Sequence, residues 1–213
     1  KKVGGISHMT MFSFHPVKHI TTGEGGIITT NNPQFARSLR MFRSHGIDPE
    51  IRRDQAQSDE PWYYEMVELG YNYRLTDISC ALGLSQLERM PKLVSRRTEI
   101  ANEYSKCLAD IPGIIIPTER PNSSSSWHIY TIQLDPTNLT VGRREIFKAL
   151  RAENIGVNVH YIPVHLHPYY RQKFGEQSGS YPIAEGAYDR LITLPLFPGM
   201  TEDDVQNVIK ATQ

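Results

Sequence analysis

The first part of the chain alternates between short apolar runs and a helical spacing of apolar residues. The run Met9–Phe14 ends at a His-Pro pair, and the β-branched run Ile27–Thr30 follows a glycine-rich turn, so each predicts a strand. Apolar residues three to four positions apart over Pro33–Ser44 predict a helix. The order strand, turn, strand, helix is typical of an α/β protein.

A long helical pattern occupies the middle of the chain. Thr76 or Asp77 can cap it, and Pro91 either kinks the helix or begins the next one. The pattern predicts two apolar faces, the first made of Ile78, Ala81, Leu82, Leu84 and Leu87 and the second of Leu93, Ile100, Tyr104, Cys107, Leu108 and Ile111. We therefore expect a long helical connector between two lobes.

The second half repeats the mixture of strands and helices. Ile129–Leu134 and Val157–Ile162 are predicted as strands, and Arg143–Asn154 as a helix. Thr201, with an acidic residue three positions later, resembles a capping box at the start of a last helix. These elements predict a second, smaller α/β lobe.

The pattern of apolar and polar residues also predicts a loop and a division of the chain into two parts. The segment Asp48–Glu60 is polar and has no period, so we expect an exposed loop there. The connector pattern divides the chain into residues 1–92 and residues 93–213. No flexible linker separates these two parts, so we expect them to pack together.

Composition narrows the function classes. The 213 residues contain 23 Lys+Arg and 23 Asp+Glu, and this zero balance gives no general reason to bind nucleic acid or an anionic membrane surface. The two cysteines, Cys80 and Cys107, are too few for a disulfide scaffold and favour a cytoplasmic location. No apolar run approaches the roughly 18 to 20 residues of a membrane span. The chain begins at Lys1 without an initiator Met, which predicts that its start is internal.

Lys18 is the first candidate for chemistry. It follows an apolar strand end and precedes the glycine cluster Gly23–Gly26, so it can be partly desolvated and held in one direction. Desolvation lowers the pKa of an ammonium group, and a neutral amine can attack a carbonyl to form a Schiff base. From spacing alone, a surface lysine at a strand end is an equally open interpretation. The glycine cluster matches no P-loop or dinucleotide motif and is expected to be a tight turn with positive φ.

Three further polar residues are candidates for anion binding. Ser13 lies five positions before Lys18 and can donate its hydroxyl to a phosphate oxygen, although it can also be an ordinary strand serine. Asn72 lies among aromatic residues before the long helix, where a turn or cap asparagine is the alternative. Arg74 can bind the phosphate or diphosphate of a substrate with its forked donors, or form a surface salt bridge.

Three histidines within a few residues raise the question of a metal site. His160, His165 and His167 could bind zinc by residue type, but Pro163 and Pro168 interrupt the extended geometry and no acidic or cysteine partner is adjacent. We therefore expect no metal. His160 can equally be a loop histidine with a local hydrogen bond.

Several motifs together carry a resemblance that covers essentially the whole chain. The stretch FSFHPVKHITTGEGGIITTN, followed by GYNYRLTD, RRTEIANEY and NVHYIPVH, resembles the DegT/DnrJ/EryC1/StrS family of sugar aminotransferases that use pyridoxal phosphate. The resemblance implies the α/β fold of fold-type I aminotransferases. Residues 1–92 would then be the later part of the large cofactor-binding domain, and residues 93–213 the small C-terminal domain.

The resemblance also implies roles for individual residues. Lys18 would hold pyridoxal 5'-phosphate covalently and move the proton during catalysis, and Ser13 would contact the cofactor phosphate. Asn72 would reach the phosphate of the neighbouring subunit's cofactor in a homodimer that shares its active sites. His160 and Tyr161 would face the nucleotide sugar.

The implied reaction is transamination from glutamate to a keto group on a nucleotide-linked sugar. The segment HYIPVHLHPYYR is closest to members that aminate a UDP-linked 4-keto-6-deoxy-N-acetylhexosamine, including those of the pseudaminic acid route, which implies a role in surface polysaccharide or glycan biosynthesis. A dehydratase of the same fold is an alternative, but it has His where this chain has Lys18.

A fragment that only binds or assembles, without turnover, is the other alternative. The family's carboxylate for the pyridine nitrogen precedes the lysine, and residues 1–17 contain no Asp or Glu. Either the chain is the later half of a longer protein, or it relies on another polypeptide.

Overall fold

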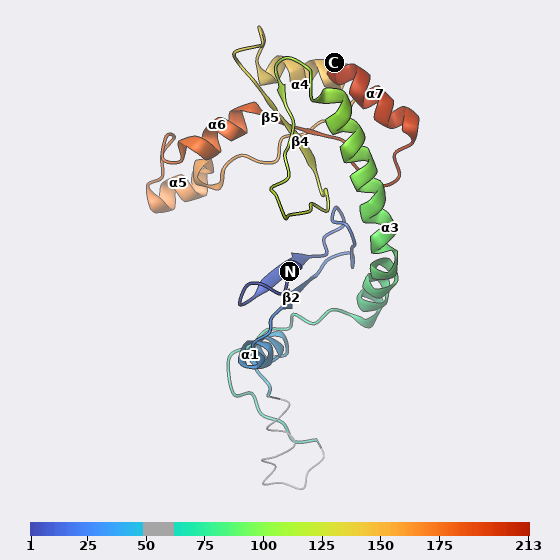
Figure 1. Ribbon diagram of the computed structural model, residues 1–213. Coiled ribbons are helices and arrows are strands. Elements are labelled where there is room, and N and C mark those ends of the chain that lie inside the picture. Colours follow the sequence, from blue (N-terminus) through green and yellow to red (C-terminus); the bar gives the residue numbers. More distant parts are fainter. Residues whose placement is uncertain (49–61) are drawn as a thin grey trace. The chain divides into compact units, whose positions relative to one another are not determined.

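The computed structural model describes residues 1–48 and 62–213, which form two compact units (Figure 1). Unit 1 comprises Lys1–Met90 and unit 2 comprises Pro91–Gln213. Each unit has its own sheet, of two strands in unit 1 and of three strands in unit 2.

Unit 1 is built on an antiparallel hairpin. Strand β1 (Thr10–Ser13) pairs with strand β2 (Gly26–Thr29), and Ser13 lies opposite Gly26 at the end where the connecting loop leaves. Helix α1 (Pro33–Arg43) follows, and its N-cap Asn32 accepts hydrogen bonds from two backbone N–H groups of the first turn. The two predicted strands and the predicted helix are confirmed, with no end shifted by more than one residue.

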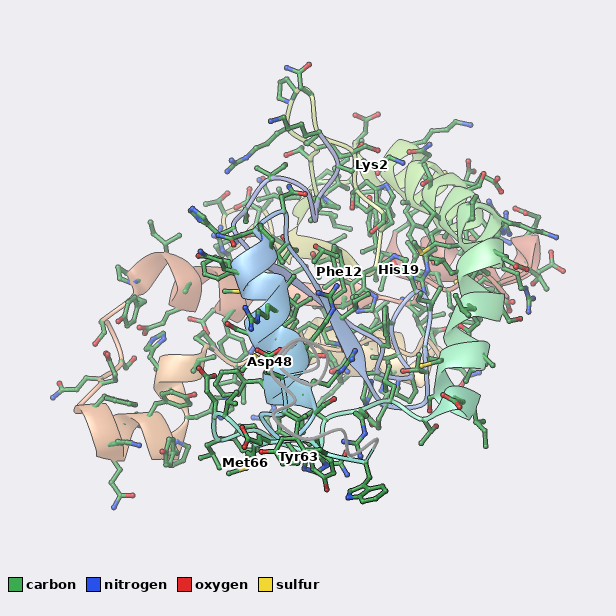
Figure 2. All side chains as sticks on the ribbon, turned by 90° about the horizontal axis from the view of Figure 1, so that it is seen from below. Lys2, Phe12, His19, Asp48, Tyr63 and Met66 are labelled. Atoms are coloured by element: carbon green, nitrogen blue, oxygen red, sulfur yellow. The ribbon has the colours of Figure 1, made fainter. Side chains whose placement is uncertain are left out.

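The residue that ends the first described stretch is buried, contrary to expectation. Asp48 is 4% exposed, and its carboxylate pairs with Arg37 of α1, beside which Figure 2 labels it. The prediction of an exposed loop is therefore wrong for Asp48, because an ion pair formed within the unit stabilises the buried carboxylate. Residues 49–60 of that predicted loop lie outside the described residues.

Helix α3 (Asp77–Leu108) is a single continuous helix that contains Pro91. Thr76 accepts a hydrogen bond from Ser79 N–H at 3.2 Å, which confirms the predicted cap. The predicted second apolar face is confirmed in its central residues, since Ile100, Tyr104 and Leu108 are almost completely buried.

The predicted first face of α3 is not buried in this structure. All five of its residues are partly or largely exposed, among them Ile78 at 85% and Leu84 at 66%. Periodicity correctly predicted the helix, but burial also needs a covering surface. Within unit 1, the described residues provide none for this face.

Unit 2 contains an antiparallel three-stranded sheet of order β3 (Ile114–Ile115), β4 (Tyr130–Leu134) and β5 (Leu191–Leu194). Strand β4 is confirmed, whereas the strand expected over Val157–Ile162 is wrong. That segment makes one isolated bridge, Asn158 to Thr193. Asn158 and Thr193 exchange both backbone hydrogen bonds, at 2.7 and 3.1 Å, but within the described residues no neighbouring pair continues this bridge into a ladder.

Five shorter helices complete unit 2: α4 (Arg143–Ala152), the 3₁₀ helix η1 (Val164–Leu166), α5 (Pro168–Phe174), α6 (Pro182–Arg190) and α7 (Glu202–Thr212). Helix α7 begins with the predicted capping box, and both of its hydrogen bonds are present. The second half of α3 packs with β4, β5, α4 and α7 around one continuous apolar core (Figure 1).

A buried arginine ties this core together. The Arg97 guanidinium on α3 is 6% exposed and donates to three backbone carbonyls, those of Trp127, His128 and Leu196. Burial lowers the pKa of Arg97. Because its charge is met by three carbonyl dipoles, the segment before β4 and the segment after β5 are held on the same helix. Within the described residues, no helix combines the length and hydropathy needed to cross a bilayer.

Candidate active site

Lys18 lies on the loop that joins β1 to β2, and backbone hydrogen bonds close this loop. Phe14 N–H donates to Gly25 O at 2.8 Å, Thr22 N–H donates to Phe14 O at 3.1 Å, and Lys18 N–H donates to His15 O at 2.9 Å. The Lys18 side chain is half-buried. The hairpin thus presents one amine at a defined place on a closed loop.

Thr21 stabilises the same loop in a way that sequence reasoning missed. Its hydroxyl donates to Phe14 O at 2.8 Å and accepts Gly23 N–H at 2.9 Å, and its own N–H donates to Gln86 Oε1 on α3 at 3.1 Å. A threonine three residues after the lysine was the available signal. These contacts tie the loop of Lys18 to the long helix.

The glycine cluster is the predicted turn. Gly23 and Gly25 have φ values of +82° and +149°, which residues with a Cβ rarely adopt. A Cβ on Gly25 would lie 2.5 Å from Thr22 Oγ1 and 2.7 Å from a Leu75 methyl carbon. Glycine at position 25 therefore permits both the turn and its close packing.

Ser13 lies at the end of β1, on the strand that leads into this loop. Its Oγ accepts His15 N–H at 3.3 Å, and the residue is exposed. The hydroxyl keeps its own proton for donation to an anion. Ser13 and Lys18 are thus both presented by the hairpin.

Asn72 lies on an extended segment bound to the end of α1. It bridges Ser44, and its neighbours Tyr71 and Tyr73 donate their N–H groups to Phe42 O and Arg43 O at 2.7 and 3.0 Å. The rings of Tyr71 and Tyr73 stack at 4.9 Å and therefore share one side. The Asn72 side chain is exposed, and within the described residues no hydrogen bond joins it to Ser13 or Lys18.

A close backbone approach holds the Asn72 segment, and the sequence did not predict it. A Cβ on Gly46 would lie 1.7 Å from Glu68 O, and one on Gly70 would lie 2.0 Å from Gly46 N. Gly46 also has a φ of +69°. Two glycines are needed here so that two chain segments can touch. Arg74, two residues beyond Asn72, is exposed.

His160 and Tyr161 belong to unit 2, on the segment that bridges β5. His160 Nδ1 lies 2.9 Å from Thr193 Oγ1. The rings of His160 and Tyr161 meet edge-to-face, with 4.5 Å between their centroids. His160 is half-buried and Tyr161 is 72% exposed. An oriented imidazole beside an exposed phenol is suited to binding a polar ligand, and sequence reasoning missed the part played by Thr193.

His165 is part of a different arrangement. It is buried, and its Nε2 lies 2.8 Å from Glu185 Oε1. The Gly179 N–H and the His165 ring both form hydrogen bonds with the Glu185 carboxylate. These two partners are the main causes that lower the pKa of Glu185 to about 2. In the part of the chain that the structure describes, no three His, Cys, Asp or Glu side chains gather into a metal-binding group.

The sequence of the chain also matches a known protein family over its whole length. The model of the DegT/DnrJ/EryC1/StrS aminotransferase family matches residues 1–213. The chain belongs to this family. The match confirms the fold class predicted from the motifs, which is that of fold-type I aminotransferases.

Individual relatives agree. The chain is 40% identical to the spore coat polysaccharide biosynthesis protein SpsC of Bacillus subtilis, covering 100% of this chain and 55% of that protein. It matches Helicobacter pylori PseC, an aminotransferase involved in the biosynthesis of pseudoaminic acid, with a TM-score of 0.87 and 32% identity over 100% of this chain and 54% of PseC. Spr1654 of Streptococcus pneumoniae in its PLP-form matches with a TM-score of 0.85 and 30% identity, over 100% and 52% of the two chains. The chain spans about half the length of these relatives.

Proposed function

We propose that the protein carrying this chain is a pyridoxal-phosphate-dependent aminotransferase of nucleotide-linked keto sugars. The observation that carries the proposal is Lys18, half-buried on a closed loop between two strands, in a chain of this aminotransferase family. Glutamate is the proposed amino donor, and a UDP-linked 4-keto-6-deoxy-N-acetylhexosamine is the proposed acceptor. The names of SpsC and PseC support surface polysaccharide or glycan biosynthesis as the setting.

The donor set of unit 1 fits the cofactor. Aminotransferases of this family depend on pyridoxal phosphate, which supplies an aldehyde that condenses with amines and a ring that withdraws electrons from the adjacent carbon. The Lys18 amine is the group that would bind the aldehyde, and the Ser13 hydroxyl is a donor for the phosphate. Residues 1–92 would belong to the large cofactor-binding domain.

Lys18 has a second task in this proposal. Besides holding the cofactor, the Nζ of Lys18 would accept and return a proton at the reacting carbon. The hydrogen bonds of Thr21 with Phe14 O and with Gln86 Oε1 hold the loop that carries Lys18. Nζ would therefore stay close to the cofactor atom that it binds. Positioning by the closed loop is thus the contribution of this part of the chain to proton transfer.

Asn72 and Arg74 are assigned to anionic groups. Asn72 is exposed on a segment fixed by Gly46 and Gly70, and we assign it to the cofactor phosphate of the partner subunit in a homodimer. Arg74 is assigned to the diphosphate of the nucleotide sugar, because its planar guanidinium donates in pairs to phosphate oxygens. Sedimentation of the full-length protein tests the dimer.

The small domain would supply the sugar side of the site. His160 is oriented by a hydrogen bond and Tyr161 is exposed beside it, so we assign both to the nucleotide sugar. Residues 93–213 would form this domain. Its apolar core provides a rigid base for the segment that carries the two residues.

The decisive experiment uses the full-length protein. The wild type is expected to show the visible absorbance of bound pyridoxal phosphate and to lose it on borohydride treatment. Lys18→Ala is expected to abolish this absorbance, whereas Lys2→Ala, an exposed lysine of the same unit, retains it. A colourless wild type, or colour that survives in Lys18→Ala, would contradict the proposed role of Lys18.

A second assay tests the reaction. The protein is incubated with glutamate and a panel of nucleotide 4-keto and 3-keto sugars, and release of 2-oxoglutarate is measured. Release with a UDP-linked 4-keto sugar is expected, and release with no member of the panel would overturn the substrate class. The same panel with residues 1–213 alone tests whether this chain turns over by itself or acts only in binding and assembly.

A further inference from the structure

Thr193 is fixed in place by the sheet on both of its sides. It lies in β5, is 5% exposed and has Thr131 of β4 as its Cα partner. On its other edge its N–H donates to Asn158 O at 2.7 Å, and its carbonyl accepts Asn158 N–H at 3.1 Å.

The Thr193 hydroxyl forms a hydrogen bond with His160 and so restrains its ring. Oγ1 lies 2.9 Å from His160 Nδ1, and His160 is two residues beyond the Asn158 that forms the bridge. A hydroxyl both donates and accepts, so this contact persists whichever ring nitrogen carries the proton.

We propose that Thr193 is a positioning residue that orients His160 toward the nucleotide sugar. The inference rests on the proposed function, because it takes His160 to face the substrate. The Tyr161 ring, packed edge-on against the imidazole, is a second constraint on its plane. In the rival interpretation, Thr193 is a buried strand threonine whose hydroxyl bonds the nearest ring without consequence for the ligand.

The first test is kinetic and uses the full-length protein. Thr193→Val removes the hydroxyl while keeping the side-chain shape, and Thr193→Ser restores the hydroxyl. Thr193→Val is expected to lower kcat/KM about tenfold, the loss of one hydrogen bond, mainly through a higher KM for the nucleotide sugar. The half-reaction with glutamate is expected to stay unchanged, and Thr193→Ser is expected to restore the KM.

The double variant separates the two interpretations. If Thr193 acts through His160, adding Thr193→Val to His160→Ala causes no further loss. An equal loss in both backgrounds, or failure of Thr193→Ser to restore the KM, would overturn the positioning role. A merely structural role predicts that equal loss.

A readout that does not depend on turnover completes the test. The ring nitrogens of His160 are followed by ¹⁵N NMR with labelled histidine, and the spectrum of His160→Ala identifies its signals. Thr193→Val is expected to move the Nδ1 signal, and Thr193→Ser to keep it. Unchanged signals in Thr193→Val would overturn the positioning even where turnover is normal. Absence of transamination in the wild type would instead overturn the proposed function, and with it the substrate side of this inference.

Discussion

The two units bury their apolar residues to very different extents. Unit 2 packs α3, its sheet and its helices around one continuous apolar cluster, whereas the described part of unit 1 buries only Ile20 and Met41 among its apolar side chains. Helix α3 runs through both units and shows the contrast within one element. Ile100 and Tyr104 are covered, while Ile78 and Leu84 are exposed.

The unit with the larger apolar core is therefore not the unit that carries the proposed cofactor lysine. Ser13 and Lys18, which we propose to bind the cofactor, lie in unit 1 on a two-stranded hairpin, and such a hairpin is marginally stable by itself. The loop of Lys18 is held by hydrogen bonds and glycine turns rather than by a core of its own. Unit 2 can hold its substrate-side segment on a closed core.

Separate expression of the two units gives the largest contrast. Residues 91–213 are expected to unfold in one cooperative transition in urea, because they contain the whole apolar cluster. Residues 1–90 are expected to show no cooperative transition. Circular dichroism during titration with urea measures both, and a cooperative transition in residues 1–90 would break the comparison.

Matched isoleucines test the same contrast at single residues. Ile132→Ala in β4 removes a side chain that is 1% exposed and is expected to cost about 2 to 5 kcal/mol of unfolding free energy. Ile78→Ala in α3, at 85% exposed, is expected to change it by no more than about 0.5 kcal/mol in residues 1–213. Equal costs in urea titrations would contradict the burial seen here. Repeating Ile78→Ala in the full-length protein shows whether its longer chain covers this face.

The Glu185 carboxylate gives unit 2 a pH dependence. The N–H of Gly179 and the His165 ring lower its pKa from 4.5 to about 2, so the stability it contributes is present above pH 4.5 and is lost as pH falls toward 2. The unfolding free energy of residues 91–213 is expected to fall more steeply over this window in the wild type than in Glu185→Gln. Parallel pH profiles for the two proteins would contradict this assignment.

The cap of α7 gives the smallest expected effect. Thr201 accepts Asp204 N–H at 3.1 Å, and Asp204 accepts Thr201 N–H at 2.8 Å. Thr201→Ala is expected to cost about 1 kcal/mol of unfolding free energy, and Thr201→Ser to cost less. Thermal unfolding of residues 91–213 measures both, and an unchanged midpoint in Thr201→Ala would show that the cap does not stabilise the helix.

The sequence by itself determined features that depend on neighbours along the chain. The caps at Thr76 and Thr201 and the turn at Gly23–Gly26 each need groups only a few residues apart, so composition and spacing predict them. The family was also predicted from the sequence, because the motif around Lys18 is a contiguous run of residues that can be recognised without a structure. Neither the local caps and turns nor the family motif depends on tertiary contacts.

Only the tertiary structure decided which surfaces are covered and which distant groups meet. Both halves of α3 carry an apolar face, yet burial depends on what packs against each. The segment Val157–Ile162 is predicted as a strand, but within the described residues it makes a single bridge to β5, at Asn158, so no ladder forms. Thr193 meets His160 across 33 residues of sequence, and no local pattern encodes that hydrogen bond.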